Sequence, residues 1–386
     1  MKSKICKRCV YPSNHPLNLT FDDFGVCSGC QIHDEKFKIN WKIKQKKLKQ
    51  IVKDYKRNSG DKHDCIVPVT GAKDSFFIVD YVKNILGLNP LLVNYNKHYN
   101  TIYSHKNLSK LRSLIGCSLI TLTVKPQIIK KITKATIRRL GSIYWHCIAG
   151  QTVFPVKMAC KLNIPLIIWG AHQGVDQVGM FSHNENVEMT RKYRKEHDLM
   201  GYEAEDFIGY KGLKKKDLEN FIYPSDEEIQ KVGVRGIYLN NFIKWDSLLQ
   251  HKKMKKKYNY FSVKQSRTFD YFNDIDCNHY NGLHDYIKYL KHGYSKVYDH
   301  CAREIRLKKI SRSKGFKIIK KYKNTKPKDI GLFLNWLGVT EKWFFKEIKK
   351  FNSFKKKEEL KKDLLTVRTK GLRDKNYLIN RGWDGK

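Results

Sequence analysis

The sequence predicts an α/β protein with a doubly wound parallel sheet, preceded by a cysteine-rich module and followed by a helical region. Three observations support this prediction. Short apolar runs alternate with helical patterns between residues 64 and 170, two CxxC pairs lie near the N-terminus, and helical periodicity dominates after residue 224. A chain of 386 residues has room for two or three domains. We therefore expect domains at residues 1–40, 41–223 and 224–386.

The N-terminal module contains Cys6 and Cys9 in one CxxC pair and Cys27 and Cys30 in a second. Paired thiolates on two tight turns are typical of a tetrahedral zinc site, and a segment this short needs such a staple to form a core. We predict a structural zinc ribbon in which the intervening residues close a small hairpin. Four unrelated free cysteines, or a redox or iron–sulfur role, are the alternatives.

Strands and helices are expected to alternate after a first helix. Residues 34–60 carry apolar residues at helical spacing, which predicts one amphipathic helix that stops at Ser59-Gly60. The expected strands are 65–69, 91–95, 118–124 and 166–169, and the expected helices between them are 74–86, 104–115, 126–140 and 142–162. We expect the last helix to be interrupted at Gly150 and Pro155. Helices should cover both faces of the sheet, and ligands should bind at the carboxyl ends of its strands.

The loop after the first expected strand is the candidate phosphate site. It turns at Gly71 and leads into a helix start, so that loop amides and the positive end of the helix would face a bound phosphate. The loop matches neither the Walker A pattern nor the dinucleotide fingerprint GxGxxG. The candidate binding residues are Thr70, Gly71, Ala72, Lys73, Asp74 and Ser75.

A second set of candidate residues follows the fourth expected strand. His172, Gln173, Asp176 and Gln177 come directly after it, at the edge where a parallel sheet binds ligands. The basic cluster 191–195 could bind phosphate or a nucleotide-linked sugar, or it could be a solvated helix face.

The pattern after residue 224 is helical. Ser225 and Glu228 form a capping-box signature, a long helical run covers 281–325, and two short helices are expected at 329–337 and 341–351. We expect this region to cover the catalytic cleft.

The net charge is +40, from 77 basic and 37 acidic residues. This charge would suit a nucleic-acid partner, but the basic runs are mixed with acidic residues or lie on expected helices. We therefore do not expect nucleic acid as the physiological partner. No apolar run is long enough to span a bilayer, and the N-terminus has no apolar signal region, so we expect a cytoplasmic protein without a transmembrane segment.

The six residues TGAKDS at 70–75 resemble SGGxDS, the pyrophosphate loop (PP-loop) of the ATP pyrophosphatases, whose fold is HUP-like. Thr70 stands for the first serine and Ala72 for the second glycine of that pattern. The resemblance implies that the loop holds the β and γ phosphates of ATP together with Mg²⁺. It also implies catalytic roles for Lys73, Asp74 and Ser75.

Longer stretches resemble the N-acetyl sugar amidotransferases, the PP-loop enzymes of lipopolysaccharide and pseudaminic-acid-type surface glycan biosynthesis. They are CKRCVYPSNHPLNLTFDDFGVCSGC with Asn40-Trp41, and residues 141–156, 166–183 and 285–306. The resemblance implies that ATP adenylates the acetamido oxygen of a sugar, which ammonia then replaces to give an acetamidino group. It further implies a sugar that is nucleotide-linked, a separate glutaminase, and a cyclase-like subunit that passes ammonia along. Position and resemblance together select His146, His172, Gln173, Asp176 and Arg306 as substrate residues.

Two other functions compete with this one. A tRNA-modifying PP-loop enzyme of the thiolase type would also combine a CxxC module with this loop, and the positive charge would suit tRNA. It would need further cysteines near the loop, for which Cys147 and Cys160 are the candidates. Alternatively, the altered loop could mark a nucleotide-binding scaffold without catalysis.

Overall fold

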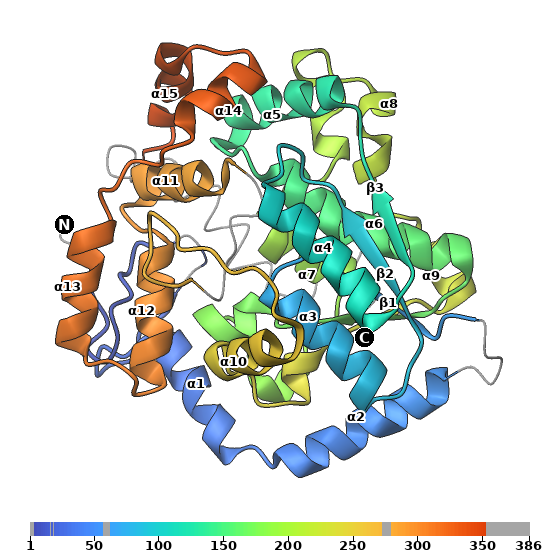
Figure 1. Cartoon of the computed structure of the whole chain (residues 1–386). Helices are drawn as coiled ribbons and strands as arrows, with labels where there is room; N and C mark the ends of the chain where they lie inside the picture. Colours follow the sequence, from blue (N-terminus) through green and yellow to red (C-terminus); the bar gives the residue numbers. More distant parts are fainter. Residues whose placement is uncertain (1–3, 16, 18, 57–61, 272–278, 353–386) are drawn as a thin grey trace.

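The computed structural model describes residues 4–15, 17, 19–56, 62–271 and 279–352 (Figure 1). Its centre is a five-stranded parallel sheet of order β3-β2-β1-β4-β5. The strands are β1 (Cys65–Pro68), β2 (Pro90–Tyr95), β3 (Leu119–Leu122), β4 (Leu166–Trp169) and β5 (Arg235–Tyr238). In the register of the sheet, Ile66 pairs with Leu91 on one side and with Ile167 on the other. The winding direction reverses at β1, and the carboxyl end of β1 is therefore the expected ligand edge.

The first four strands confirm the sequence prediction, with shorter bounds at β1 and β3. β5 corrects it, because Arg235–Tyr238 lies in the segment that we expected to be helical. The strand has four residues and begins with arginine and glycine, so it lacks the long apolar run of a recognisable buried strand. The expected domain boundaries stay a prediction.

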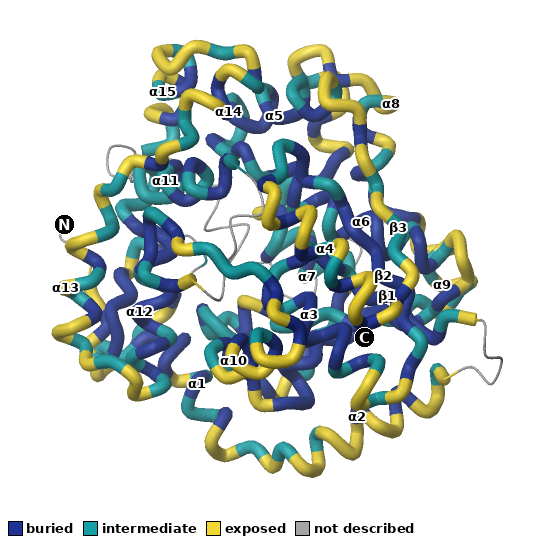
Figure 2. Tube along the Cα trace, viewed as in Figure 1, coloured by how far each residue is buried: buried dark blue, intermediate teal, exposed yellow. Residues whose placement is uncertain are grey.

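Helices cover both faces of the sheet, as expected for a doubly wound fold. Successive strand residues point to opposite faces: Cys65 and Val67 belong to one apolar core and Ile66 to another. On the first face lie α2 (Trp41–Tyr55), α3 (Lys73–Asp80) with the π-helical turn η1 (Tyr81–Ile85), α4 (Ile102–Ile115) and α10 (Ser247–Tyr258). On the second face lie α6 (Trp145–Leu162) and α9 (Asp226–Val232). β1, β2, β4 and β5 are largely buried, whereas the edge strand β3 is only partly buried, and α2 at the lower edge of Figure 2 is largely exposed.

Two helices differ from the sequence prediction. The single helix expected over residues 34–60 is two helices, α1 (Ser28–Lys38) and α2, because the chain is extended at Ile39 and Asn40 caps α2 by accepting a hydrogen bond from the Ile43 amide. The expected stop at Ser59-Gly60 lies outside the described residues. α6 runs through Gly150 and Pro155 without interruption. A Cβ atom on Gly150 would lie 2.4 Å from the Tyr95 ring, so this glycine allows the helix to approach β2 closely.

After β5 the C-terminal region is helical, and its helices pack against the N-terminal cysteine module and against α5. The capping box of Ser225 and Glu228 begins α9 as predicted. α12 (Lys296–Arg306) and α13 (Arg312–Tyr322) share one apolar core with the N-terminal cysteine module. α11 (Asn281–His292), α14 (Ile330–Leu337) and α15 (Glu341–Lys349) pack with α5 (Pro126–Leu140) at the top of Figure 1. The C-terminal helices thus pack both against the N-terminal cysteine module and against α5 of the α/β part.

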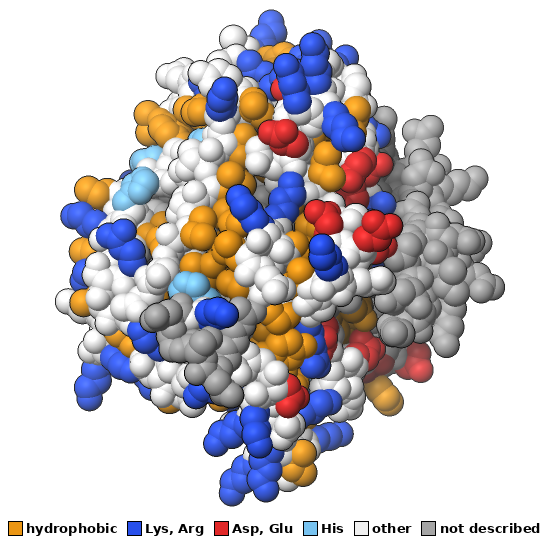
Figure 3. Space-filling model, turned by 90° about the vertical axis from the view of Figure 1, so that its right-hand side faces the viewer, with side chains coloured by type: hydrophobic (Ala, Val, Ile, Leu, Met, Phe, Trp, Pro, Cys, Tyr) orange, Lys and Arg blue, Asp and Glu red, His pale blue; other side chains and the backbone are white. Residues whose placement is uncertain are grey.

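The connections contain short helices: α7 (Arg191–Tyr193), α8 (Lys215–Leu218) and the turns η2 (Gly174–Val178), η3 (His183–Glu185), η4 (Arg194–Asp198), η5 (Glu205–Phe207), η6 (Tyr210–Gly212), η7 (Glu219–Phe221) and η8 (Leu239–Asn241). Among the described helices, none combines the length and apolar character that a bilayer crossing requires. On the face in Figure 3, acidic side chains are interspersed among the lysines and arginines.

Candidate functional site

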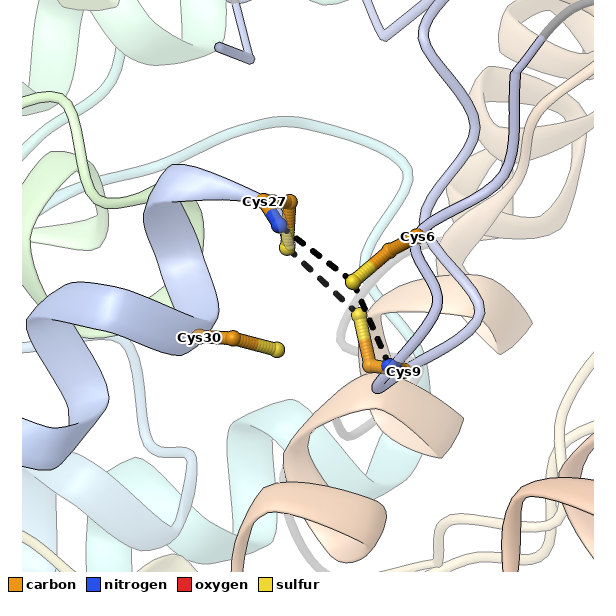
Figure 4. A group of neighbouring side chains, drawn as sticks. All are labelled: Cys6, Cys9, Cys27 and Cys30. Carbon is orange, nitrogen blue, oxygen red and sulfur yellow. Dashed lines mark hydrogen bonds between the residues drawn. The ribbon is translucent and has the colours of Figure 1, made fainter. Parts of the chain in front are cut away.

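The four cysteines of the two CxxC pairs converge on one point (Figure 4). Their sulfur atoms all lie within 4.8 Å of one another, and all four side chains are buried. Cys6 and Cys9 lie on a turn closed by an Ile5–Pro12 bridge, whereas Cys27 precedes α1 and Cys30 lies in its first turn. Four converging thiols are the donor set of a structural tetrahedral site, so the residues fit zinc. The predicted cluster is confirmed.

Hydrogen bonds distinguish the Cys6 sulfur from the others. It accepts backbone hydrogen bonds from Cys9 and Cys27, each at 3.3 Å, in the manner of a metal-binding knuckle. Hydrogen bonds from the neighbouring thiols, Cys27 first, hold the pKa of Cys6 far below its ordinary value. The pKa values of Cys9, Cys27 and Cys30 are raised instead, so without a metal ion the cluster places its negative charge on Cys6.

The candidate phosphate loop lies at the carboxyl end of β1. The Thr70 amide donates to the Ser75 hydroxyl at 2.9 Å, and the Ser75 amide donates to the Ala72 carbonyl at 3.0 Å. Gly71 has φ +80°, and a Cβ atom there would lie 3.2–3.3 Å from Leu108 and the Ser104 carbonyl. Both the backbone conformation and the space therefore favour glycine. The loop closes directly onto the first turn of α3.

Lys73 and Asp74 form an ion pair at the start of α3. Lys73 is fully buried, and its Nζ lies 5.7 Å from the centre of the Trp245 ring. Asp74 keeps a side chain that is 36% exposed. Both a cation and a carboxylate are thus held at the amino end of the helix.

Asp74 lines a pocket to which five parts of the chain contribute. The loop after β4 supplies Gln173, Asp176 and Gln177, and α12 supplies Arg306. These five residues were all singled out from the sequence, and the structure brings them together. The remaining lining residues are His33, Lys36, Trp245, Ser247, Asp299, His300, Arg303 and Leu307.

Lys36 and Asp176 form a buried ion pair between α1 and η2. Burial alone would raise the pKa of Asp176, but the charge and hydrogen bond of Lys36 outweigh burial and hold that pKa below its ordinary value. Asp176 is therefore ionised at neutral pH, and one wall of the pocket is tied to the cysteine module.

Of the candidate loop residues 70–75, only Asp74 lines the pocket, and two of the candidate substrate residues lie elsewhere. His172 is buried against Phe181 and Tyr238, and His146 is buried with its Nδ1 at 3.1 Å from the Tyr95 hydroxyl. Burial lowers the pKa of each to about 3, so both rings are neutral at pH 7. Neither lines the pocket, and their assignment to substrate stays a prediction.

The basic cluster 191–195 is not uniformly solvated. Arg194 is fully buried and pairs with Glu203 at 2.5 Å, and Arg191 donates to the Pro224 carbonyl at 2.7 Å. Arg194 thus stabilises the loop after β4 from within, whereas the Arg191 side chain is partly exposed.

Several pocket residues were not found from the sequence. His300 and Arg303 lie on α12, and Lys36 lies on α1, where a lone basic residue on a helix gives no signal of a site. Trp245 and Ser247 follow β5. Recognition of that strand would have placed them at the ligand edge of the sheet.

A protein-family model matches the C-terminal part of the chain. Residues 255–367 match the family model described as the C-terminal domain of WbpG-like LPS biosynthesis proteins. No curated protein matches the chain. The matched part includes α12, and with it Arg303 and Arg306 of the pocket. Fold, pocket and match together indicate a biosynthetic enzyme. The match supports a role in the biosynthesis of lipopolysaccharide or a related surface glycan.

Proposed function

We propose that the chain is an ATP-dependent amidotransferase that converts the acetamido group of an N-acetyl sugar into an acetamidino group. The observation that carries this proposal is the TGAKDS loop at the carboxyl end of β1, with Asp74 facing a pocket beside α12. The match of residues 255–367 supports the glycan class of the substrate. The chemistry rests on the resemblance of the loop to the PP-loop.

The loop supplies what the expulsion of pyrophosphate requires. Amides at the start of α3, the Ser75 hydroxyl and the Lys73 ammonium can stabilise charge on the β and γ phosphates. Asp74 is the carboxylate at this position that could hold Mg²⁺, which would neutralise phosphate charge. Because Lys73 is buried beneath Trp245, its charge acts in a site with little water.

The reaction needs an activated amide, since an amide is a poor electrophile. The acetamido oxygen attacks the α-phosphorus of ATP, pyrophosphate leaves, and the amide N–H proton is released. Ammonia then adds to the activated carbon and AMP leaves with the former amide oxygen, which gives the acetamidine. We propose that a separate glutaminase and a cyclase-like subunit in the cytoplasm supply the ammonia.

The far side of the pocket suits an anionic sugar carrier. Arg303 on α12 and Lys36 on α1 line it, and nucleotide-linked sugars carry a diphosphate. Arg303 is paired with Asp270 and Glu304 and Lys36 with Asp176, so a diphosphate would share these cations with their carboxylates. Gln173 and Gln177 offer amide groups for sugar hydroxyls. We propose that ATP binds at the loop and the sugar near α12. The pocket between them has a volume of about 30 Å³, so it must widen to admit these ligands.

The tRNA thiolase alternative is less well supported. Cys147 is buried and lies 3.0 Å from the Tyr280 hydroxyl, and Cys160 borders a different pocket with Lys157 and Glu219. Within the described part of the chain, no cysteine lines the pocket that contains Asp74. A persulfide mechanism would require one there.

The test is product formation from a panel of acceptors. The protein is incubated with ATP, Mg²⁺, ammonium and either UDP- or CMP-linked N-acetyl sugars or tRNA, and products are analysed by mass spectrometry. The proposal predicts a sugar in which one oxygen is replaced by NH. ATP-dependent modification of tRNA instead, or no AMP with any acceptor, would refute it.

A further inference from the structure

The cysteine module and the pocket wall meet through two glycines. The Ser28 hydroxyl donates to the Val178 carbonyl at 3.1 Å. A Cβ atom on Gly179 would lie 2.5 Å from the Ser28 carbonyl oxygen, and one on Gly29 would lie 2.9 Å from the Gln177 carbonyl oxygen. The start of α1 therefore rests directly on the turn η2, without space for a side chain between the two backbones.

Arg306 fills the junction of the two segments. Its Nη1 donates to the Gln177 carbonyl at 2.5 Å, and its Nη2 lies 3.7 Å from the Cys27 sulfur. The guanidinium also lies 4.8 Å from the centre of the Tyr11 ring, and the residue is only 3% exposed. One planar group thus touches the thiol centre and the backbone of the pocket wall.

A buried guanidinium needs a negative partner. Within the ranges that the structure describes, no carboxylate forms an ion pair with Arg306, and a carbonyl oxygen carries only partial charge. Four thiolates around one Zn²⁺ would leave a net negative charge beside Nη2. The metal-loaded cysteine centre would therefore supply the counter-charge that holds Arg306 in place.

We propose that Arg306 is a positioning residue through which the four-cysteine centre fixes the pocket wall formed by Gln173, Asp176 and Gln177. Loss of the metal, by chelation or thiol oxidation, removes the counter-charge and loosens η2. This inference rests on the contacts of Arg306 and does not require the amide chemistry proposed above.

Hydrogen exchange tests it without an activity assay. In the full-length zinc-loaded protein, the amides of residues 174–180 should be protected from exchange. Removal of the metal by a chelator should accelerate the exchange of these amides about tenfold or more. The amides of β1 and β2 should keep their protection. Arg306→Gln should show the faster exchange at 174–180 with zinc still bound. It should also release zinc to a chromophoric chelator about tenfold faster, the usual scale for loss of a hydrogen-bond partner of a metal ligand.

Arg312→Gln is the matched control. Arg312 donates hydrogen bonds to the carbonyls of Cys6 and Cys9 at 2.9 Å, and it does not line the pocket. This variant should release zinc faster and yet keep the protection of 174–180 while loaded. Wild-type protection of 174–180 in zinc-loaded Arg306→Gln would overturn the proposal. If Arg306→Gln does not fold, the test is the comparison of zinc-loaded and chelator-treated wild-type protein. Equal exchange of residues 174–180 in these two samples would also overturn the proposal.

Discussion

The backbone N–H of Thr70 donates a hydrogen bond of 2.9 Å to the hydroxyl oxygen of Ser75. This bond closes the loop between β1 and α3 on itself. It orients the Ser75 side chain toward the amides that would face a phosphate. Thr70 stands where the PP-loop pattern that this loop resembles has a serine, and the contact is made by its backbone, so it does not depend on the side chain at this position.

Replacement of Ser75 by alanine should separate catalysis from stability. We expect AMP formation to fall about 100-fold or more, as for loss of one donor to transition-state charge. The free energy of unfolding should fall by only about 1 kcal/mol, the scale of one hydrogen bond. Ser118→Ala, at an exposed position, is the control. Turnover of Ser75→Ala within about threefold of wild type would contradict the assigned role.

The cysteine centre should bind about one zinc ion per chain, because four buried thiols form a closed tetrahedral site. Cys6→Ser should abolish stoichiometric zinc and lower the melting temperature, since the same core includes α12 and α13. Elemental analysis and thermal unfolding measure the two effects. Cys301→Ser, a buried cysteine of the same core outside the cluster, should keep its zinc. Freshly purified protein without zinc would contradict this account.

The close contact at Gly29 should make it intolerant of a side chain. A Cβ atom there would lie 2.4 Å from Arg306 Nη2 and 2.9 Å from the Gln177 carbonyl oxygen. Gly29→Ala should therefore destabilise the protein by about 1–3 kcal/mol, the usual cost of overpacking. Gly331→Ala is the matched control, because a Cβ atom on this residue of α14 meets nothing within 4 Å. It should be neutral or slightly stabilising in a denaturant titration. Equal effects of the two changes would be inconsistent with a tight junction.

Acid should destabilise the protein through its buried histidines. Burial lowers the pKa of His146 from 6.5 to about 3, so the unfolded chain binds the extra proton between these pH values. Its contribution to stability is therefore present above pH 6.5 and is lost as the pH falls toward 3. His146→Gln should flatten the decline in the unfolding free energy over this range, whereas the exposed His105→Gln should not. An unchanged slope in His146→Gln would argue against a neutral buried ring.

The sheet was predictable because its first four strands carry dense apolar runs between helix signals. β5 was missed because Arg235 and Gly236 leave it only two apolar residues, whereas the equally short β1, β3 and β4 consist mainly of apolar residues. The break at Ile39 was missed because helical spacing continues across it, and only the cap at Asn40 marks the new start. Local patterns thus identify elements but not every boundary.

Apart from Arg306 on α12, which the resemblance selected, the pocket was predictable only where its residues follow strands. Asp74, Gln173 and Asp176 could be assigned to the ligand edge by their place after β1 and β4. Lys36 and Arg303 could not, because their position depends on how α1 and α12 pack against that edge. Such long-range packing leaves no periodic signal in the sequence.

The central claim is that ATP activates the acetamido oxygen, and oxygen-18 transfer tests it most directly. The protein is given ATP, ammonium and an N-acetyl nucleotide sugar labelled with oxygen-18 in the acetamido carbonyl, and the same sugar without its acetyl group is the control. The account predicts equal amounts of AMP and pyrophosphate, with the label in the AMP phosphate, and no AMP from the control sugar. Unlabelled AMP, or formation of ADP instead, would contradict it.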